Sequence, residues 1–252
     1  MLSGAILIFY ILGGIVFAEK KLLLKGKTKQ FFLSEKENLL ILQFGDEATS
    51  FDGEVKSKFK NKSVYKRAIS EAIYEYLHSY NIPTHFSKKF ADNQLQVKKL
   101  EMIPILIVIR NIAAGSLCKR FNVKEGMFLK YPIIEYYLKT DKNESVFIHE
   151  SHAYAFDYAS PEEMKHISRL ALKINAVLKS FFERRNLRLV DYQLEFGRYQ
   201  NQIYLGDEIT PDTSRIWPIE NGDPYLKKRY SFKNGAAEAS YKEIHDRLVR
   251  KR

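Results

Sequence analysis

The densest group of charged and hydroxyl side chains in this chain lies in Asp207-Glu208-Ile209-Thr210-Pro211-Asp212-Thr213-Ser214-Arg215. It directly follows the short apolar run Ile203-Tyr204-Leu205-Gly206. An unpaired charge is costly to bury, because the ion loses its hydration. The stretch therefore predicts a strand that opens into a loop, and this loop is expected to bind a charged ligand or a metal ion.

The segment before this loop alternates polar and apolar side chains with the period of a β-strand. One face is expected to carry Val190, Tyr192, Leu194 and Phe196, and the other Asp191, Gln193 and Glu195. A short turn over residues 197–201 should pair this strand with 203–205 and bring Glu195 close to Asp207. Two carboxylates on adjacent strands, with few soft ligands nearby, suit Mg²⁺ that carries a nucleotide phosphate. The alternative is an exposed acidic edge.

Length and composition indicate a globular protein with a substantial core. The 252 residues suffice for one large domain or two closely joined lobes; 45% are hydrophobic and 28% are charged. The net charge of +11 favours anionic partners, although a lysine-rich surface that serves solubility is an equal explanation. No nucleic-acid motif stands out, so nucleic acid is not an expected partner. The single cysteine, Cys118, excludes an intrachain disulfide and predicts a cytoplasmic protein.

The first 18 residues differ from the rest of the chain. Residues 2–18 form an uncharged apolar run whose length is at the lower limit for crossing a bilayer. Three interpretations are open: a start codon assigned too far upstream, a membrane anchor, and a cleaved signal peptide. The first is favoured, because a compact domain can begin near Phe17. Membrane contact is therefore not expected.

Two further segments carry basic side chains at positions that suit anions. Residues 21–34 predict two strands joined over Gly26, with Lys27 and Lys29 on one face, which suits a polyphosphate. A solvated basic face is the more common explanation of such a pattern. The apolar run 105–109 predicts a buried strand, and it ends in Arg110-Asn111-Ile112-Ala113-Ala114-Gly115-Ser116. An arginine there, followed by small residues and a hydroxyl, favours an anion-binding turn.

The remaining pattern predicts a mixture of strands and helices. Further strands are expected at residues 39–44, 95–100 and 133–139, with a break at 101–104 before the buried strand. Helices are expected over 66–80, and from the capping box Ser160-Pro161-Glu162-Glu163 to about Arg185.

Five motifs together resemble the SAICAR synthetase (phosphoribosylaminoimidazole-succinocarboxamide synthase) family. They are Gly26-Lys27-Thr28-Lys29, Lys98-Lys99-Leu100-Glu101-Met102-Ile103-Pro104, Arg110-Asn111-Ile112-Ala113-Ala114-Gly115-Ser116-Leu117, Leu189-Val190-Asp191-Tyr192-Gln193-Leu194-Glu195-Phe196-Gly197 and Asp207-Glu208-Ile209-Thr210-Pro211-Asp212-Thr213-Ser214-Arg215-Ile216-Trp217. They occur in the family's order. The motifs that begin at Arg110 and Asp207 are highly specific, whereas the Gly-Lys pair alone is not.

The resemblance implies an α+β enzyme with two lobes, antiparallel sheets and an ATP cleft between the lobes, in a kinase-like or ATP-grasp-like arrangement. Residues 1–18 would be an N-terminal extension, 19–103 a β-rich ATP-binding lobe, and 104–252 a larger lobe for substrate and metal. The implied reaction joins L-aspartate to carboxyaminoimidazole ribonucleotide (CAIR) in de novo purine synthesis and splits ATP into ADP and phosphate. A carboxylate is a poor electrophile, so ATP would first convert it into an acyl phosphate.

The resemblance also implies a role for each matching position. ATP binding is implied for Lys27, Lys29, Lys98, Leu100, Met102, Glu195 and Asp207, and Mg²⁺ binding for Glu195 and Asp207. Ribonucleotide binding is implied for Arg110, Ser116, Ser214 and Arg215. Catalytic roles are implied for Lys139, Asp212 and Arg215.

The chain departs from the family pattern at four places. Gln193 replaces a lysine between the acids of the strand, Ser145-Val146 replaces Asp-Pro, and His149 replaces an asparagine. Near the C-terminus, Lys-Asp-Arg-Phe-Arg is replaced by Lys227-Lys228-Arg229-Tyr230-Ser231. The alternative function is therefore a catalytically impaired member that binds nucleotides or acts as a membrane-tethered interaction protein. The oligomeric state stays open, with a homo-oligomer as one alternative.

Overall fold

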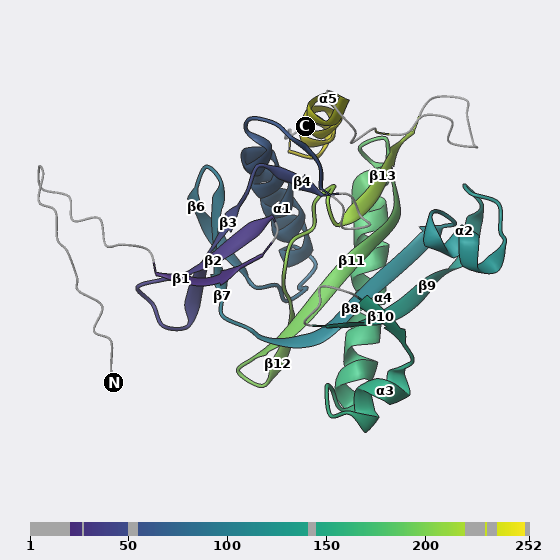
Figure 1. Ribbon diagram of the computed structural model, residues 1–252, viewed down its shortest axis with the longest axis horizontal. Coiled ribbons are helices and arrows are strands. Elements are labelled where there is room, and N and C mark those ends of the chain that lie inside the picture. The colour runs from purple at the N-terminus through teal and green to yellow at the C-terminus, as the bar shows by residue number, and fades with distance from the viewer. Residues whose placement is uncertain are drawn as a thin grey trace, which may run out of the picture.

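The computed structural model describes residues 21–26, 28–49, 55–140, 145–219, 230 and 236–249. The apolar run 2–18, Lys27 and the departures at 227–229 and 231 lie outside the described residues. None of the described helices is long and apolar enough to cross a membrane. Two antiparallel sheets with helices packed against them make up the described fold (Figure 1).

The smaller sheet comes from the first part of the chain. Its strand order is β1-β2-β3-β7-β6, and every neighbouring pair is antiparallel. The strands are β1 (Leu22–Lys25), β2 (Lys29–Leu33), β3 (Leu39–Phe44), β6 (Phe86–Ala91) and β7 (Gln94–Lys98). A separate hairpin consists of β4 (Glu47–Thr49) and β5 (Val55–Lys58). Helix α1 (Lys62–His78) contacts β3, β6 and β7.

The larger sheet has the order β10-β9-β8-β11-β12, and β13 also pairs with β11. Its strands are β8 (Glu101–Ile112), β9 (Phe128–Lys139), β10 (Ser145–Ile148), β11 (Leu187–Tyr199), β12 (Gln202–Leu205) and β13 (Ser214–Pro218). The long helix α4 (Pro161–Glu183) packs on β11 (Figure 1). The other helices are α2 (Ser116–Phe121), α3 (Glu150–Ala155) and α5 (Ala236–Val249), and α5 contacts α1.

One hydrophobic core joins the two sheets. Leu42 and Ile73, from the smaller sheet and α1, belong to the same buried cluster as Ile107 and Ile174, from the larger sheet and α4. The backbone connects the sheets as well, because His85 N donates to Leu205 O at 2.8 Å. A shared core of this kind holds the faces of the two sheets in a fixed relation.

The predicted start of α4 is confirmed. Ser160 Oγ accepts a hydrogen bond from Glu163 N at 3.1 Å, and Glu163 Oε2 accepts one from Ser160 N at 2.9 Å. Pro161 occupies the first helical position, where its missing N–H is not needed. The local sequence therefore specifies this helix start without help from the rest of the fold.

The predicted break at residues 101–104 is wrong, because β8 runs without interruption from Glu101 to Ile112. Pro104 is tolerated because the register against β11 shifts between the partners of Glu195 and Gly197. On the other side, pairing with β9 begins only at Ile105. A proline inside a sheet is accommodated at such an irregularity, where no ladder hydrogen bond is lost.

The predicted face of Val190 is also wrong. The register of β11 against β13 shifts between Leu189 and Asp191. Val190 consequently joins a small separate cluster with Ile112, Ala114 and Trp217, whereas Leu189 and Tyr192 both belong to the main core. A bulge that inserts one residue reverses the alternation beyond it, which strict period-two reasoning misses.

Candidate active site

A cavity of about 440 Å³ lies between residues of the two sheets. Its lining is Leu23, Leu24, Lys25, Gly26, Lys29, Phe31, Leu40, His85, Lys98, Lys99, Leu100, Met102, Lys139, Glu195 and Asp207. The apolar members come mainly from β1–β3 and from the connection between β7 and β8. The charged members include Lys29 from β2 and Glu195 from β11. An apolar wall beside a few converging charges is typical of a small-molecule site.

Two glycines let the connection between the sheets lie directly on the β11–β12 hairpin. A Cβ atom on Gly197 would lie 2.8 Å from Leu100 Cβ and 2.9 Å from Glu101 O. A Cβ atom on Gly206 would lie 3.2 Å from Leu100 Cδ1. Glycine is therefore required at position 197 for this close approach, which places Leu100 and Met102 in the cavity wall.

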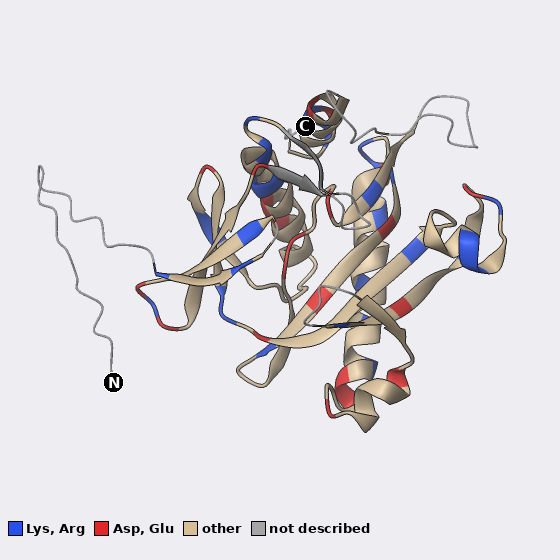
Figure 2. Cartoon of the chain, in the orientation of Figure 1, with Lys and Arg blue, Asp and Glu red and all other residues tan. Residues whose placement is uncertain are grey.

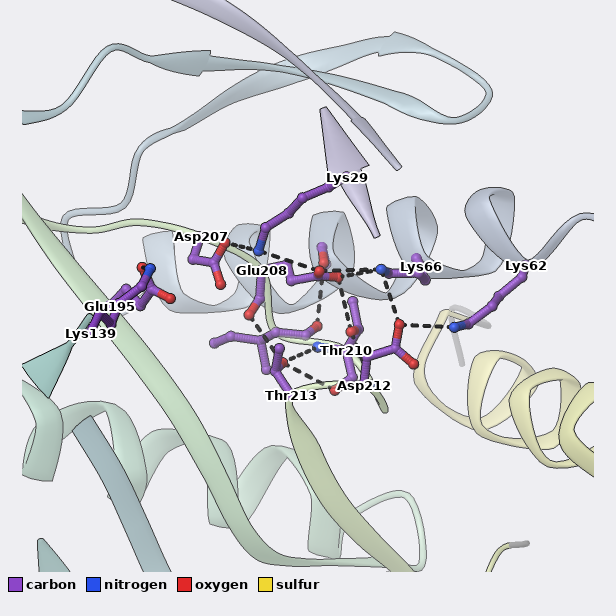
Figure 3. A network of polar contacts seen from close by, with 12 residues as sticks. Lys29, Lys62, Lys66, Lys139, Glu195, Asp207, Glu208, Thr210, Asp212 and Thr213 are labelled. Atoms are coloured by element: carbon purple, nitrogen blue, oxygen red, sulfur yellow. Dashed lines mark hydrogen bonds and ion pairs between the residues drawn. The ribbon is translucent and has the colours of Figure 1, made fainter. Parts of the chain in front are cut away.

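Lysines neutralise both predicted metal ligands. Lys29 forms an ion pair with Asp207 and lies 3.4 Å from Glu208 Oε1, while Lys139 Nζ donates to Glu195 Oε2 at 2.8 Å (Figure 3). Gly206 N donates to Glu195 O at 2.8 Å, which holds Glu195 next to the start of the loop. The predicted proximity of Glu195 and Asp207 is thereby confirmed, since both line the cavity.

Burial and neighbouring charges together shift the pKa values of Lys29 and Glu195. Burial opposes the charge on Lys29, but the carboxylates of Asp207, Glu208 and Glu195 outweigh it and raise the pKa of Lys29. Burial and the Asp207 charge raise the pKa of Glu195, and Lys139 and Lys29 partly oppose this rise. A cation or a phosphate that enters here would therefore meet groups whose ionisation depends strongly on their partners.

His85 is a cavity residue to which sequence reasoning gave no role. Its Nε2 atom is buried and has no hydrogen-bond partner among the residues that the structure describes. The ring packs edge-on against Tyr74 with 5.4 Å between centroids. Burial lowers the pKa of His85 to about 4, so the imidazole is neutral near pH 7. A buried ring next to Lys98 and Asp207 could have been found only from the fold.

The predicted change from strand to loop is confirmed, since β12 ends at Leu205, but two of the three carboxylates of the loop are buried, which was not expected. Glu208 and Asp212 are only 2% and 5% exposed. Lys66 Nζ lies 3.0 Å from Glu208 Oε2 and 3.1 Å from Asp212 Oδ2, and Lys62 Nζ lies 2.9 Å from Asp212 Oδ2 (Figure 3). The other Asp212 oxygen accepts a hydrogen bond from Tyr241 of α5. Buried carboxylates are tolerated here because each is paired.

Sequence reasoning left Lys62 outside the helix that it predicted over 66–80, whereas α1 begins at Lys62. It included Lys66 as the first helical residue but assigned it no role. Asn61 is a residue type that is common at helix starts, but here it precedes the helix without a side-chain capping hydrogen bond. One signal was available. Lys62 and Lys66 share the spacing of Ile69 and Ile73 and therefore lie on the buried stripe of the helix.

A second group of side chains surrounds Arg110. Its guanidinium donates to Glu135 Oε2 at 2.7 Å, to Asp191 Oδ2 at 2.9 Å and to Ser116 Oγ at 3.0 Å. Arg110 is almost fully buried. Burial opposes its charge, yet Glu135 and Asp191 outweigh this effect and raise the pKa of Arg110. The predicted pair of Arg110 and Ser116 is therefore assembled, and the arginine is already held by two acids.

Arg215 joins this group from the other side of Asp191. Its Nη1 donates to Asp191 Oδ2 at 3.2 Å, and its side chain is 20% exposed. Gly115 has a φ of 56°, and a Cβ atom there would lie 2.7 Å from Arg215 Nη2. The glycine thus allows the guanidinium to rest against the backbone at the end of β8. The fold therefore brings Arg215 to Arg110 and Ser116, which lie far earlier in the sequence.

Of the other predicted residues, Ser214 lies on β13 next to Arg215, whereas Lys98 lines the cavity. Ser214 is buried, and its Oγ has no hydrogen-bond partner within the described ranges. Lys98 Nζ donates to Thr84 O at 3.4 Å and lies 5.3 Å from the centre of the Tyr204 ring. Arg120, which was not predicted, forms an ion pair with Glu135 and is more exposed than Arg110.

Three of the four departures from the family pattern lie within the described residues. Gln193 N donates to Thr213 O at 2.9 Å, so this position connects β11 to the loop through its backbone. His149 caps α3 by accepting a hydrogen bond from Ser151 N at 3.2 Å. Ser145 begins β10 at the edge of the larger sheet.

A family model described as SAICAR synthetase matches residues 22–248. The chain belongs to the SAICAR synthetase family. Its fold is the α+β fold with antiparallel sheets that the motifs implied. The motifs, which occur in the family's order, meet at two places. One is the cavity, and the other is the group of Arg110, Ser116, Asp191 and Arg215, which we call the basic cluster.

Individual members of the SAICAR synthetase family agree with this assignment. A phosphoribosylaminoimidazole-succinocarboxamide synthase from Prosthecochloris aestuarii is 43% identical over 228 residues, which cover 90% of this chain and 97% of the relative. The crystal structure of such a synthase from Ehrlichia chaffeensis has a TM-score of 0.83 and 34% identity, covering 91% of this chain and 98% of the other. A SAICAR synthetase in complex with ADP has a TM-score of 0.82 and 36% identity, covering 91% and 97%.

Proposed function

We propose that this protein is an ATP-dependent ligase that joins L-aspartate to CAIR and yields SAICAR, ADP and phosphate. Membership of the SAICAR synthetase family is the observation that carries this proposal. The cavity and the adjacent basic cluster supply two neighbouring sites of the kind that the reaction needs. We place the reaction in the cytoplasm, which the single cysteine supports.

The cavity is proposed as the nucleotide site. Leu100 and Met102 would bound the base, and Lys29, with Lys27 and Lys98, would contact the phosphates. This orientation puts the apolar wall against the apolar part of the nucleotide and the charges against its phosphates. A SAICAR synthetase structure in complex with ADP supports nucleotide binding by this chain. The boundary between the proposed lobes, residues 19–103 and 104–252, falls within β8, three residues after the connection from β7.

We assign a Mg²⁺ site to Glu195 and Asp207. Mg²⁺ is commonly held by one or two protein carboxylates together with phosphate oxygens. Within the described part of the chain, no group of three or more His, Cys, Asp or Glu residues could hold a metal alone. This agrees with a metal that the protein shares with the nucleotide. When bound, the ion would supply neutralisation of the charge on the transferring phosphoryl group.

The basic cluster is proposed as the ribonucleotide site. Arg215 is partly exposed and can turn its guanidinium to an anionic substrate group, while Arg110 keeps Asp191 and Ser116 in place. Arg guanidinium groups bind phosphate and carboxylate with two parallel hydrogen bonds. Ser214 lies next to Arg215 on β13 and has a buried hydroxyl that can accept or donate.

Catalysis would follow from alignment of the two sites. A carboxylate oxygen of the ribonucleotide attacks the γ-phosphorus of ATP, and ADP leaves. The aspartate amine then attacks the acyl carbon and displaces phosphate. Lys139, beside Glu195, and Arg215 would neutralise the charges that meet at this point. Asp212, for which the family resemblance implied a catalytic role, has both oxygens paired and buried, so we assign it a positioning role instead.

An ADP-release assay on the full chain tests the proposal. ADP release that requires both L-aspartate and CAIR is expected. A chain that binds ADP but shows no turnover at high enzyme concentration would refute the ligase and favour the impaired nucleotide-binding alternative. Gln193, where the family has a lysine, is the observation that favours this alternative.

A further inference from the structure

Four buried side chains on α1 contact the loop that begins at Asp207. They occur at every fourth position, which places them on one face of the helix. They are Lys62, Lys66, Ser70 and Tyr74, and we call this set the α1 ladder. All four are fully buried. Two lysines at such positions are unexpected, because an ammonium group is costly to bury without partners.

Each residue of the α1 ladder donates a hydrogen bond to a different residue of the loop. Lys62 donates to Asp212 at 2.9 Å, and Lys66 donates to Glu208 at 3.2 Å. Ser70 Oγ donates to Ile209 O at 3.3 Å, and the Tyr74 hydroxyl donates to Asp207 O. The loop is therefore attached to a single rigid helix along its length, from the proposed metal ligand to the residue three places before Arg215.

Lys66 occupies the central position of this attachment. It pairs with both Glu208 and Asp212, and Lys62 also pairs with Asp212. Glu208 in turn lies 3.4 Å from Lys29, which pairs with Asp207 in the cavity. Three ammonium groups and three carboxylates thus form one connected network (Figure 3). Removing the Lys66 charge would divide this network in the middle.

We propose that Lys66 is a positioning residue: through Glu208 and Asp212 it fixes the loop 207–215, and so sets the spacing between the nucleotide half and the ribonucleotide half of the site. The names of the two halves rest on the proposed function. Asp207 at one end of the loop lines the cavity, and Arg215 at the other end lies against Gly115 and Asp191. A shift of about 1 Å between aligned reactants can reduce a rate about 100-fold.

A substitution of Lys66 by methionine keeps an unbranched side chain that is one heavy atom shorter, and it removes the charge. We expect Lys66→Met to lower kcat by about 100-fold while each KM changes less than about fivefold, because the substrates keep their own contacts in the two halves. Hydrogen exchange should accelerate at the amides of Thr210 and Thr213, which donate within the loop.

Arg67→Met is the matched control. Arg67 is the next residue of α1, is also buried, and forms an ion pair with Glu71 and a 2.9 Å hydrogen bond to Asp92 O, away from the loop. This variant should lose thermal stability and keep kcat within about threefold of the wild type. Equal losses of kcat in the two variants would refute a positioning role.

A charge-balanced variant separates positioning from stability. Lys66→Met leaves the loop carboxylates with one ammonium group fewer and is expected to lower the thermal midpoint. Lys66→Met/Glu208→Gln restores the balance and should recover the midpoint without recovering kcat. If the double variant regains wild-type kcat, charge balance alone matters and the proposal is wrong. With Glu208→Gln alone and the wild type, these variants form a double-mutant cycle, which measures the coupling between Lys66 and Glu208.

The exchange measurement keeps this proposal separate from the proposed reaction. If the wild type shows no turnover with CAIR and L-aspartate, the reaction is wrong and loop exchange alone decides about Lys66. Faster exchange at Thr210 and Thr213 in Lys66→Met, but not in Arg67→Met, then supports the positioning role. Identical loop exchange in the two variants overturns it.

Discussion

The orientation of a charged side chain in the cavity depends on its ion-pair partner and on the local backbone, as Asp207 shows. Asp207 pairs with Lys29 and has a left-handed backbone, with φ 58°. Its carboxylate is thus directed by the backbone turn and held by one ammonium group. Asn and Asp adopt this conformation more readily than most residues, which fits an acid at the start of the loop.

Asp207→Asn should abolish turnover and leave the fold intact. The amide is nearly the same size, so packing is kept, but it removes the negative charge that the proposed metal requires. We expect a loss of at least about 100-fold in kcat. Steady-state ADP release and a thermal melt would be measured together. Turnover at the wild-type rate would contradict the metal role.

His85 should make the protein sensitive to mild acid. In the unfolded chain its pKa is near 6.5, and burial lowers it to about 4 in the folded protein. Between these values the unfolded state binds more protons, so stability falls as the pH decreases from 6.5 to 4 and is retained above 6.5. The shift corresponds to about 3 kcal/mol.

Urea unfolding of wild type and His85→Gln at pH 7, 5.5 and 4.5 checks this. The variant should lose less stability between pH 7 and pH 4.5 than the wild type. An identical pH dependence of the two proteins would mean that His85 is not kept neutral by burial.

Whole elements position the site through close contacts of their backbones. The connection between β7 and β8 rests on the β11–β12 hairpin because Gly197 and Gly206 have no side chains. The same hairpin carries Glu195 and leads to Asp207. The wall of the proposed nucleotide site and the proposed metal ligands therefore lie on elements that contact each other directly, so we expect a change in one to alter the other.

Gly197→Ala should weaken nucleotide binding. The added methyl group would meet Leu100 Cβ at 2.8 Å and the backbone oxygen of Glu101 at 2.9 Å, so the connection must move away. Overpacking of this kind commonly costs about 1–3 kcal/mol. We expect ADP affinity, measured by titration calorimetry, to fall by about tenfold.

Gly206→Ala is the graded comparison for this prediction. Its methyl group would meet only side-chain atoms of Leu100 and Met102, at 3.2 Å, and these can shift. Its effect on ADP affinity should be smaller. A larger effect of Gly206→Ala than of Gly197→Ala would show that the close backbone contact does not set the nucleotide wall.

The molecule as a whole places its site between two sheets that share one core. Figure 2 shows that the positions of basic and acidic residues are interspersed along the ribbon over both sheets and their helices in this view. This distribution fits the binding of small anions at a cleft. The shared core means that neither sheet is expected to unfold without the other.

Thermal unfolding should therefore show one transition, and ADP with Mg²⁺ should raise its midpoint. Ligand at 100 times its dissociation constant stabilises the folded state by about 2.7 kcal/mol. Differential scanning calorimetry with and without ligand measures the shift. Two separate transitions, with only one of them shifted, would contradict a common core.

Sequence alone was sufficient for the family, the fold class, most strands and the start of α4, because these depend on local periodicity, capping residues and motifs. It also located the acids at 195 and 207 and the arginines at 110 and 215. Tertiary structure decided which charges are available to a ligand. Glu208 and Asp212 are buried because Lys66 and Lys62, about 140–150 residues earlier in the chain, neutralise them. Such pairing has no local pattern, since the free energy of a buried charge depends on groups that only folding brings near.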